Sequence, residues 1–172
     1  METIYWSVFK NSQWPLHIAA SEKGLCYVGS PGEGFKELEA WVLKHRPKAQ
    51  IVENEEFLKP YFTELNDYLE GSVTSFNFPV DTMGTPFQES IWAALKEIPY
   101  GRTVTYSDIA NIIGKPAAVR AVGSAIGANP VMITIPCHRV IGKNGALTGF
   151  RGGIEMKKFL LEHETKFAVV QQ

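Results

Sequence analysis

A thiol and an imidazole stand side by side at Cys137 and His138. A cysteine thiolate is a strong nucleophile, and a neighbouring histidine can act as the base that generates it. The preceding residues, from Ile133 on, predict the end of an apolar strand, on which successive side chains point to opposite faces. The two groups can therefore cooperate only if Pro136 turns the chain or if a water molecule bridges them. A free buried cysteine can also serve only as a small hydrophobic side chain.

Cys26 is the other cysteine of the 172-residue chain, and no second cysteine lies near it in the sequence. His17 and His45 do not show the spacing of metal ligands, so we expect no metal ion. The first ten residues lack the basic start and apolar run of a signal peptide, and no stretch approaches the roughly 18 apolar residues that span a bilayer. These features predict a soluble, cytoplasmic protein with reduced thiols.

Charge is distributed unevenly along the chain. The net charge is −1, but residues 1–84 carry 7 Lys and Arg against 12 Asp and Glu, whereas residues 85–172 carry 10 against 6. The C-terminal half is therefore the one suited to a polyanion such as nucleic acid, although local charge of this size can also serve solubility alone. With 45% hydrophobic residues, the chain is long enough to form one domain or two small ones.

The first half of the sequence predicts a small α+β unit. Alternation places Ile4, Trp6 and Val8 on one face of a strand, and residues 16–20 and 25–29 form a hairpin around a turn at residues 21–24. Helical spacing follows over residues 35–45 and 56–69, and a last strand is expected over residues 74–80. No group of nucleophile, base and acid is evident here, so we expect a scaffold.

A helix start opens the second half at Thr85-Pro86-Phe87-Gln88, which supplies an N-cap, a proline at the first helical position and a capping-box glutamine. Phe87, Ile91 and Leu95 form the inward face of this helix. A short helix over residues 109–113, capped by Ser107-Asp108 and ended by Gly114, precedes another that begins at Lys115 and runs to about Ile126. A final helix is expected over residues 155–164.

The two short helices and the glycine between them form a helix-turn-helix pattern, in which the second helix is presented to DNA. The face of that helix opposite its apolar residues carries one cation among small side chains: Ala117, Arg120, Ala121 and Ser124. So narrow a surface can approach a minor groove, where one cation or wedge disturbs the base stack. The small residues equally fit close packing of the helix against a neighbour.

Several motifs of the second half resemble those of the O6-alkylguanine-DNA alkyltransferases, also called methylated-DNA-protein-cysteine methyltransferases. The resemblance rests on Pro136-Cys137-His138-Arg139-Val140 together with residues 85–88, 98–101, Tyr106, 118–123, 129–130 and 152–153. It implies an α+β fold, with an N-terminal ribonuclease-H-like α/β domain over residues 1–82. A mainly α, winged-helix-like domain with the helix-turn-helix would follow over residues 83–172.

The resemblance implies that Cys137 accepts a methyl group from the O6 atom of an alkylated guanine, or from O4 of an alkylated thymine. His138 would act as the base, held by the carboxylate of Glu164. The spacing supports Glu164, which follows Leu160 and Leu161 on the same helix face; a frayed glutamate at the helix end is the alternative. Tyr106 is implied to donate a proton or hydrogen bond to the departing guanine.

The resemblance also implies how the chain meets DNA. Arg120, with Ala121 and Ser124 beside it, would enter the minor groove of a duplex and fill the space of a flipped-out nucleotide. The residues implied to shape the loop and the substrate pocket are Asn129, Val140, Phe150, Arg151 and Met132. Asn129 would fasten the helix-turn-helix to the active-site loop.

We therefore predict a monomeric DNA repair protein that transfers one alkyl group irreversibly to its own Cys137, without a diffusible cofactor. A lesion-binding module that only signals damage is the alternative, although binding-only relatives typically carry tryptophan in place of the cysteine. A Cys-His hydrolase would need an oxyanion hole, for which the sequence offers no specific candidate.

Overall fold

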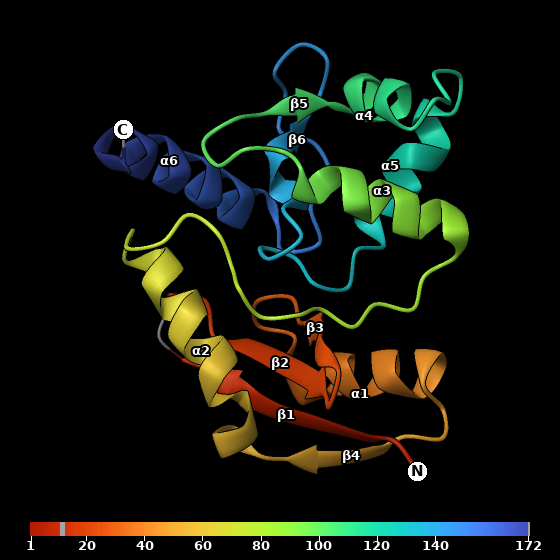
Figure 1. Ribbon diagram of the computed structural model, residues 1–172, viewed down its shortest axis with the longest axis vertical. Helices are drawn as coiled ribbons and strands as arrows, with labels where there is room; N and C mark the ends of the chain where they lie inside the picture. Colours follow the sequence, from red (N-terminus) through yellow and green to blue (C-terminus); the bar gives the residue numbers. More distant parts are fainter. Residues whose placement is uncertain (11–12, 172) are drawn as a thin grey trace. The chain divides into compact units, whose positions relative to one another are not determined.

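Strand β1 (Thr3–Phe9) lies inside the sheet of the first of two units into which the chain divides, Met1–Met83 and Gly84–Gln172. The computed structural model describes residues 1–10 and 13–171. β1 pairs antiparallel with β2 (Leu16–Ser21) and parallel with β4 (Gln50–Glu53), while β3 (Gly24–Val28) pairs antiparallel with β2. The sheet order is therefore β3-β2-β1-β4 (Figure 1).

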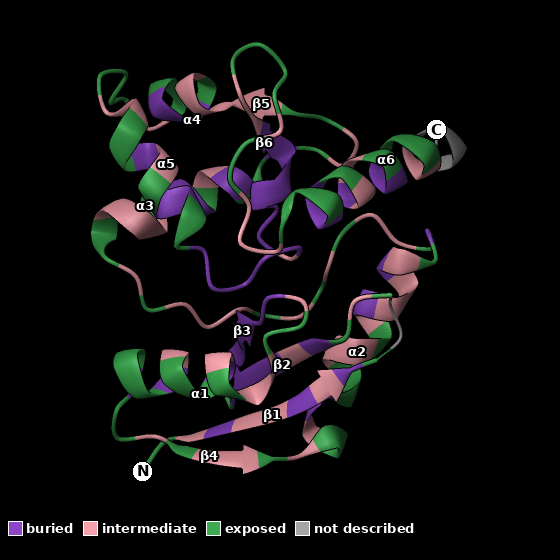
Figure 2. Ribbon diagram, turned by 180° about the vertical axis from the view of Figure 1, so that it is seen from behind, coloured by how far each residue is buried: buried purple, intermediate pink, exposed green. Residues whose placement is uncertain are grey.

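Successive side chains of β1 anchor a helix on each face of this sheet, as the alternation of a strand requires. Ile4 packs with Leu38 and Val42 of α1 (Gly34–His45), whereas the ring of Tyr5 stacks on Phe57 of α2 (Glu55–Leu69) with centroids 4.1 Å apart. β3 is buried along its whole length (Figure 2). The predicted hairpin and both predicted helices are confirmed.

The second unit is mainly helical (Figure 1). α3 (Pro86–Lys96) starts at the predicted capping box, and its Trp92 donates a hydrogen bond of 2.9 Å to the carbonyl oxygen of Ala125 in α5 (Val119–Gly127). Strands β5 (Val104–Thr105) and β6 (Val140–Ile141) pair in parallel, and the 3-10 helix η1 (Cys137–Arg139) leads directly into β6. α6 (Ile154–Gln171) ends the unit. The predicted α+β class is confirmed.

The strand expected over residues 74–80 is wrong. In this segment only Val80 forms a β-bridge, to Leu25, which also accepts a hydrogen bond of 2.8 Å from the amide of Asp81. The rings of Phe76 and Phe78 pack on α2 instead, where Phe78 meets Tyr61 edge-on at 4.9 Å. Aromatic packing on a helix thus replaces the strand pairing that the composition suggested, and the edge strand β4 was missed because it has only 4 residues.

The helix-turn-helix has different boundaries from those predicted. α4 (Tyr106–Ile112) begins at Tyr106 because Thr105 and Asp108 form a capping box one turn before the expected start. Gly114 has φ +75°, and the amide of Lys115 donates a hydrogen bond back to the carbonyl oxygen of Ala110. The chain is therefore still in a turn at Lys115, where a helix was expected. The second helix therefore begins at residue 119. The last helix runs on to residue 171. Among the described residues, no helix is long and apolar enough to cross a membrane.

Candidate active site

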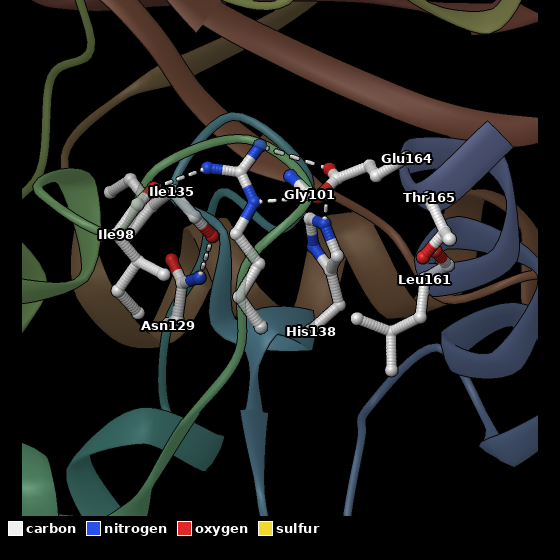
Figure 3. Close-up of polar contacts among 9 residues, drawn as sticks. Ile98, Gly101, Asn129, Ile135, His138, Leu161, Glu164 and Thr165 are labelled. Carbon is white, nitrogen blue, oxygen red and sulfur yellow. Dashed lines mark hydrogen bonds and ion pairs between the residues drawn. The ribbon is translucent and has the colours of Figure 1, made fainter. Parts of the chain in front are cut away.

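A tight turn, not a strand, carries Cys137 and His138. The apolar strand predicted before them is wrong, since residues 131–135 form turns and Ile133 has φ +75°. In the 3-10 helix η1 successive side chains diverge by about one-third of a turn, so the two groups do not point to opposite faces. Asn129 secures the turn by donating to the carbonyl oxygen of Ile135 at 2.8 Å (Figure 3). It also accepts a hydrogen bond of 2.9 Å from the amide of Val131.

His138 faces the carboxylate of Glu164 on α6 (Figure 3). Nε2 of the imidazole lies 2.7 Å from Oε2 of the glutamate, and the two side chains are 0% and 1% exposed. Nδ1, the other ring nitrogen, is buried and has no hydrogen-bond partner among the described residues. The imidazole is thus oriented by an acid on one side and keeps a nitrogen available for a proton on the other. Because α6 continues to residue 171, Glu164 does not lie at a frayed helix end.

Arg139 is the second partner of this carboxylate. Its Nε donates to Oε1 of Glu164 (2.8 Å) and its Nη2 to Oε2 (2.9 Å), which is the bidentate geometry that suits a guanidinium and a carboxylate. Nη1 donates to the carbonyl oxygen of Ile98 (2.6 Å) in the turn that follows α3. The arginine thereby connects η1, α6 and this turn.

The charges of this buried group can be assigned from its contacts. Burial alone would raise the pKa of Glu164, but hydrogen bonds from His138 and Arg139 outweigh burial and hold the pKa well below its usual range. Burial lowers the pKa of His138, although the carboxylate of Glu164 opposes this. At neutral pH the site therefore contains an ionised glutamate and an uncharged imidazole.

Cys137 is 7% exposed and lines a small pocket together with Ile126, Gly127, Asn129, Gly149, Phe150 and Arg151. Burial raises the pKa of its thiol, and a hydrogen bond with Asn129 and the charges of Arg151 and Lys157 act in the opposite direction. The resting group is a thiol, so a base must remove its proton before it can act as a nucleophile.

The two-stranded sheet holds the start of α4 next to the segment that carries Cys137. Val104 pairs with Val140, which directly follows η1, and Tyr106 is the first residue of α4 after β5. The Tyr106 hydroxyl donates to the carbonyl oxygen of Thr148 at 3.3 Å. A phenol, a thiol and an imidazole are therefore carried by neighbouring elements of one unit.

The second helix of the helix-turn-helix presents the face expected of it. Arg120, Ala121 and Ser124 all lie exposed to solvent on α5, whereas Val122 and Ile126 are buried. Ala117 is exposed too, but it lies in the turn before the helix. The outward surface therefore carries one long cationic side chain among small ones.

Lys157 is a site residue that sequence reasoning missed. Its side chain is fully buried, and its Nζ donates to the carbonyl oxygens of Val140 (2.6 Å) and Thr148 (2.9 Å). It precedes Glu164 by seven positions, so the helical repeat that pointed to Glu164 also places Lys157 on the inward face. Met132, expected near the pocket, is fully buried and is not among the pocket-lining residues. Arg151 does line the pocket, and its guanidinium also donates to the carbonyl oxygens at 129 and 130.

Both units match models of one protein family. Residues 4–82 match the ribonuclease-like domain of 6-O-methylguanine DNA methyltransferase, and residues 86–166 match the DNA binding domain of the same family. The first match agrees with the ribonuclease-H-like character expected of the N-terminal unit, and the second contains every residue of the site described above.

Whole-chain relatives lead to the same family. The inducible methylated-DNA-protein-cysteine methyltransferase of Bacillus subtilis is 56% identical over 164 residues, which cover 95% of this chain and 92% of the relative. The methylated-DNA-protein-cysteine methyltransferase of Methanosarcina acetivorans is 44% identical over 94% of this chain and 98% of its own.

Solved structures resemble the fold over nearly its whole length. The O6-methylguanine methyltransferase of Mycobacterium tuberculosis superimposes with a TM-score of 0.82 at 34% identity, covering 98% of this chain and 99% of that chain. A complex of the M. tuberculosis protein with DNA gives a TM-score of 0.77 at 36% identity over 96% and 94%. With its site, its two domains and these relatives in agreement, the chain belongs to the 6-O-methylguanine DNA methyltransferase family.

Proposed function

We propose that this protein repairs alkylated DNA by direct reversal, with Cys137 as the acceptor of the alkyl group from O6 of guanine or O4 of thymine. One observation carries the proposal: Cys137, His138 and Glu164 are all buried, and His138 is hydrogen-bonded to Glu164, within the unit that matches the family's DNA binding domain. In one displacement a bond forms between Sγ and the alkyl carbon as the bond from that carbon to the base oxygen breaks. The base leaves with the electron pair.

Proton movements complete this displacement. The thiol of Cys137 loses its proton to Nδ1 of His138, directly or through one water molecule, because Nε2 is already engaged with Glu164. The base that leaves carries negative charge and takes the proton of the Tyr106 hydroxyl, so a neutral nucleobase remains in the DNA. The phenolate of Tyr106 then regains a proton from solvent, and His138 releases to solvent the proton that it took from Cys137. No diffusible cofactor takes part in these steps.

The product on the protein is a thioether, which is not readily cleaved, so each chain acts once. A monomer is sufficient, since all these groups come from one unit of one chain. The acceptor must also be a free thiol, which is the form of both Cys26 and Cys137 here. Such a thiol is preserved in the reducing cytoplasm, where we place the reaction.

The approach to DNA follows from the atom that must be reached. O6 of a paired guanine lies at the major-groove edge of a stacked base. The nucleotide therefore has to rotate out of the stack to meet a thiol that is buried in a protein bound at the minor groove. We assign the outward face of α5 to the minor groove, with Arg120 in the space left by the nucleotide and Ala121 and Ser124 permitting close approach. Residues 83–172 then form the DNA-binding and acceptor domain, and residues 1–82 a scaffold.

Intact-mass spectrometry tests the transfer. The protein is incubated with a duplex that contains one O6-methylguanine, with undamaged duplex and a Cys137→Ser variant as controls. We expect a gain of one methyl mass per chain, located on the peptide with Cys137, and no gain in either control. Lesion-selective binding without any mass gain would instead indicate a damage sensor and would remove the roles given to Cys137, His138 and Glu164.

Nucleotide flipping has its own test in an Arg120→Ala variant. Arg120 is exposed, so the free energy of unfolding should change by no more than about 0.5 kcal/mol. Transfer from alkylated duplex should slow, while transfer from the free O6-alkylguanine base, which needs no flipping, should keep the wild-type rate. Arg102→Ala, at another exposed arginine of the same unit, is the matched control. Equal slowing with duplex and free base would contradict the role given to Arg120.

A further inference from the structure

One buried carboxylate accepts hydrogen bonds from three residues in the second unit. Besides His138, Glu164 receives two hydrogen bonds from Arg139 and a long one, of 3.4 Å, from the amide of Gly101. Arg139 is itself 7% exposed, so the ion pair is screened little by water. The nitrogens of Arg139 lie 2.8 and 2.9 Å from the carboxylate oxygens, and Nε2 of the imidazole lies 2.7 Å away. The proton path of the proposed reaction uses only the imidazole.

We propose that Arg139 is a positioning residue of the transfer reaction: by neutralising Glu164 it keeps His138 uncharged, with the ring proton on Nε2 and Nδ1 able to accept the proton of Cys137. The inference rests on the proposed function for its catalytic meaning. The effect of Arg139 on the charge and tautomer of His138 is a property of the resting protein and can be measured without DNA.

The tautomer follows from the hydrogen bonds. An ionised carboxylate can only accept, so Nε2 of His138 must carry the proton that it shares with Glu164. In an uncharged imidazole the other nitrogen then has a free lone pair. That nitrogen is Nδ1, the atom without a partner among the described residues.

The charge state follows from the groups around His138. Glu164 and Arg139 together carry no net charge, and Lys157 contributes positive charge from α6. Tyr100, whose ring lies 5.6 Å from the guanidinium of Arg139, stays neutral because burial, and then the charge of Glu164, raise its pKa to about 12. A proton added to His138 would create an uncompensated buried cation, which is costly.

Removal of the arginine reverses this balance. Without Arg139 the carboxylate of Glu164 would be an unpaired buried anion beside His138, and protonation of the imidazole would neutralise it. The pKa of His138 should then rise, so that the imidazole is charged at neutral pH and cannot accept a proton. Transfer would be slow at pH 7 and would recover as the pH is raised, the opposite of a loss caused by unfolding.

Nuclear magnetic resonance of the histidine side chains in the full chain tests the charge state without DNA. The sequence has 4 histidines, and the resonances missing from a His138→Gln variant assign the one at 138. In the wild type we expect an uncharged ring with the proton on Nε2 at pH 7. A charged ring or the opposite tautomer in the wild type would overturn the proposal, whatever the variants do.

Variants then separate charge from packing. In Arg139→Met the titration of His138 should move upward by about 1 to 3 pH units, and the pH profile of methyl transfer should move with it. Arg139→Lys keeps the charge and should restore the profile. The double variant Arg139→Met/Glu164→Gln leaves no unpaired anion, so it keeps the fold if the single variant does not, and its imidazole should again be uncharged.

A folded Arg139→Met variant with an unshifted His138 titration would refute the role of Arg139. So would a charged imidazole in the double variant. If the titration shifts as expected but the wild type transfers no methyl group, the proposed function fails while the electrostatic role of Arg139 stands, so the two failures are distinguishable.

Discussion

Lys157 joins the backbone of β6 to the loop that holds the Tyr106 hydroxyl, and its charge is fully buried. A Lys157→Met variant keeps the length of the side chain but leaves the carbonyl oxygens of Val140 and Thr148 without this donor. One buried polar group that loses its partner costs about 1 to 3 kcal/mol. Because two carbonyl oxygens lose their donor here, we expect the free energy of unfolding, measured in urea, to fall by this amount or more. Lys158→Met, one position along and exposed, should change it by less than about 0.5 kcal/mol. Equal effects at the two positions would contradict a structural role for the ammonium group.

Residue types revealed only part of the site. Cys137 and His138 could be selected by their chemistry, and Glu164 by its place on a helix face. Arg139 and Lys157 could not be selected in this way, because arginine and lysine are exposed by default and are buried only when specific partners are present. Those partners are largely backbone carbonyl oxygens, at Ile98, Val140 and Thr148, which a sequence does not distinguish from any others.

At the scale of elements, the turn after α3 lies close to α6 at Gly101, whose amide donates a hydrogen bond to the carboxylate of Glu164. Gly101 has φ +79°, and a Cβ atom there would lie 2.8 Å from the Cβ of Ala168. A Gly101→Ala variant should push the last turns of α6 away and displace the carboxylate that orients His138. We expect methyl transfer to slow by on the order of 10- to 100-fold, as small misplacements of catalytic groups do.

Gly32 provides the matched control for this prediction. It has a similar φ of +81°, but no described atom beyond its chain neighbours lies within 4 Å of the position that a Cβ would take. Gly32→Ala therefore introduces the same backbone strain without the contact, and it should leave the single-turnover rate unchanged. If both variants react at the wild-type rate, the contact between Gly101 and α6 does not position the site.

Local signals predicted elements well where the deciding contacts are local. The capping box of Thr85 and Gln88 lies within four residues, and α3 starts where it predicts. The strand prediction for residues 74–80 failed because the aromatic side chains there pack on α2, the preceding helix, and a pattern of alternation does not show whether such side chains belong to a strand or pack on a helix. The predicted start of α5 was wrong for a different reason, because a proline such as Pro116 is equally compatible with a turn and with a first helical position.

At the scale of the whole molecule, the uneven charge found in the sequence predicts how binding to DNA depends on salt. Each cation that neutralises a phosphate releases a counterion, so the logarithm of affinity falls linearly with the logarithm of salt concentration. Lys143 is exposed at the tip of the turn between Gly142 and Ala146, which is closed by a hydrogen bond of 2.8 Å. Lys143 is thus one of the exposed cations of the basic unit, and we expect it to contact a phosphate.

A Lys143→Gln variant should therefore bind duplex DNA more weakly and reduce the slope of that salt dependence by about 1. Lys44→Gln removes an exposed charge from α1 in the acidic unit and should leave the slope unchanged. The measurement is a fluorescence anisotropy titration with undamaged duplex over a series of salt concentrations, so that transfer does not consume the protein. Equal slopes for both variants and the wild type would mean that the turn at Lys143 does not touch phosphate. If instead Lys44→Gln bound more weakly and had the smaller slope, the DNA contact would lie in the first unit. That result would contradict the proposal that the second unit binds DNA and the first is a scaffold.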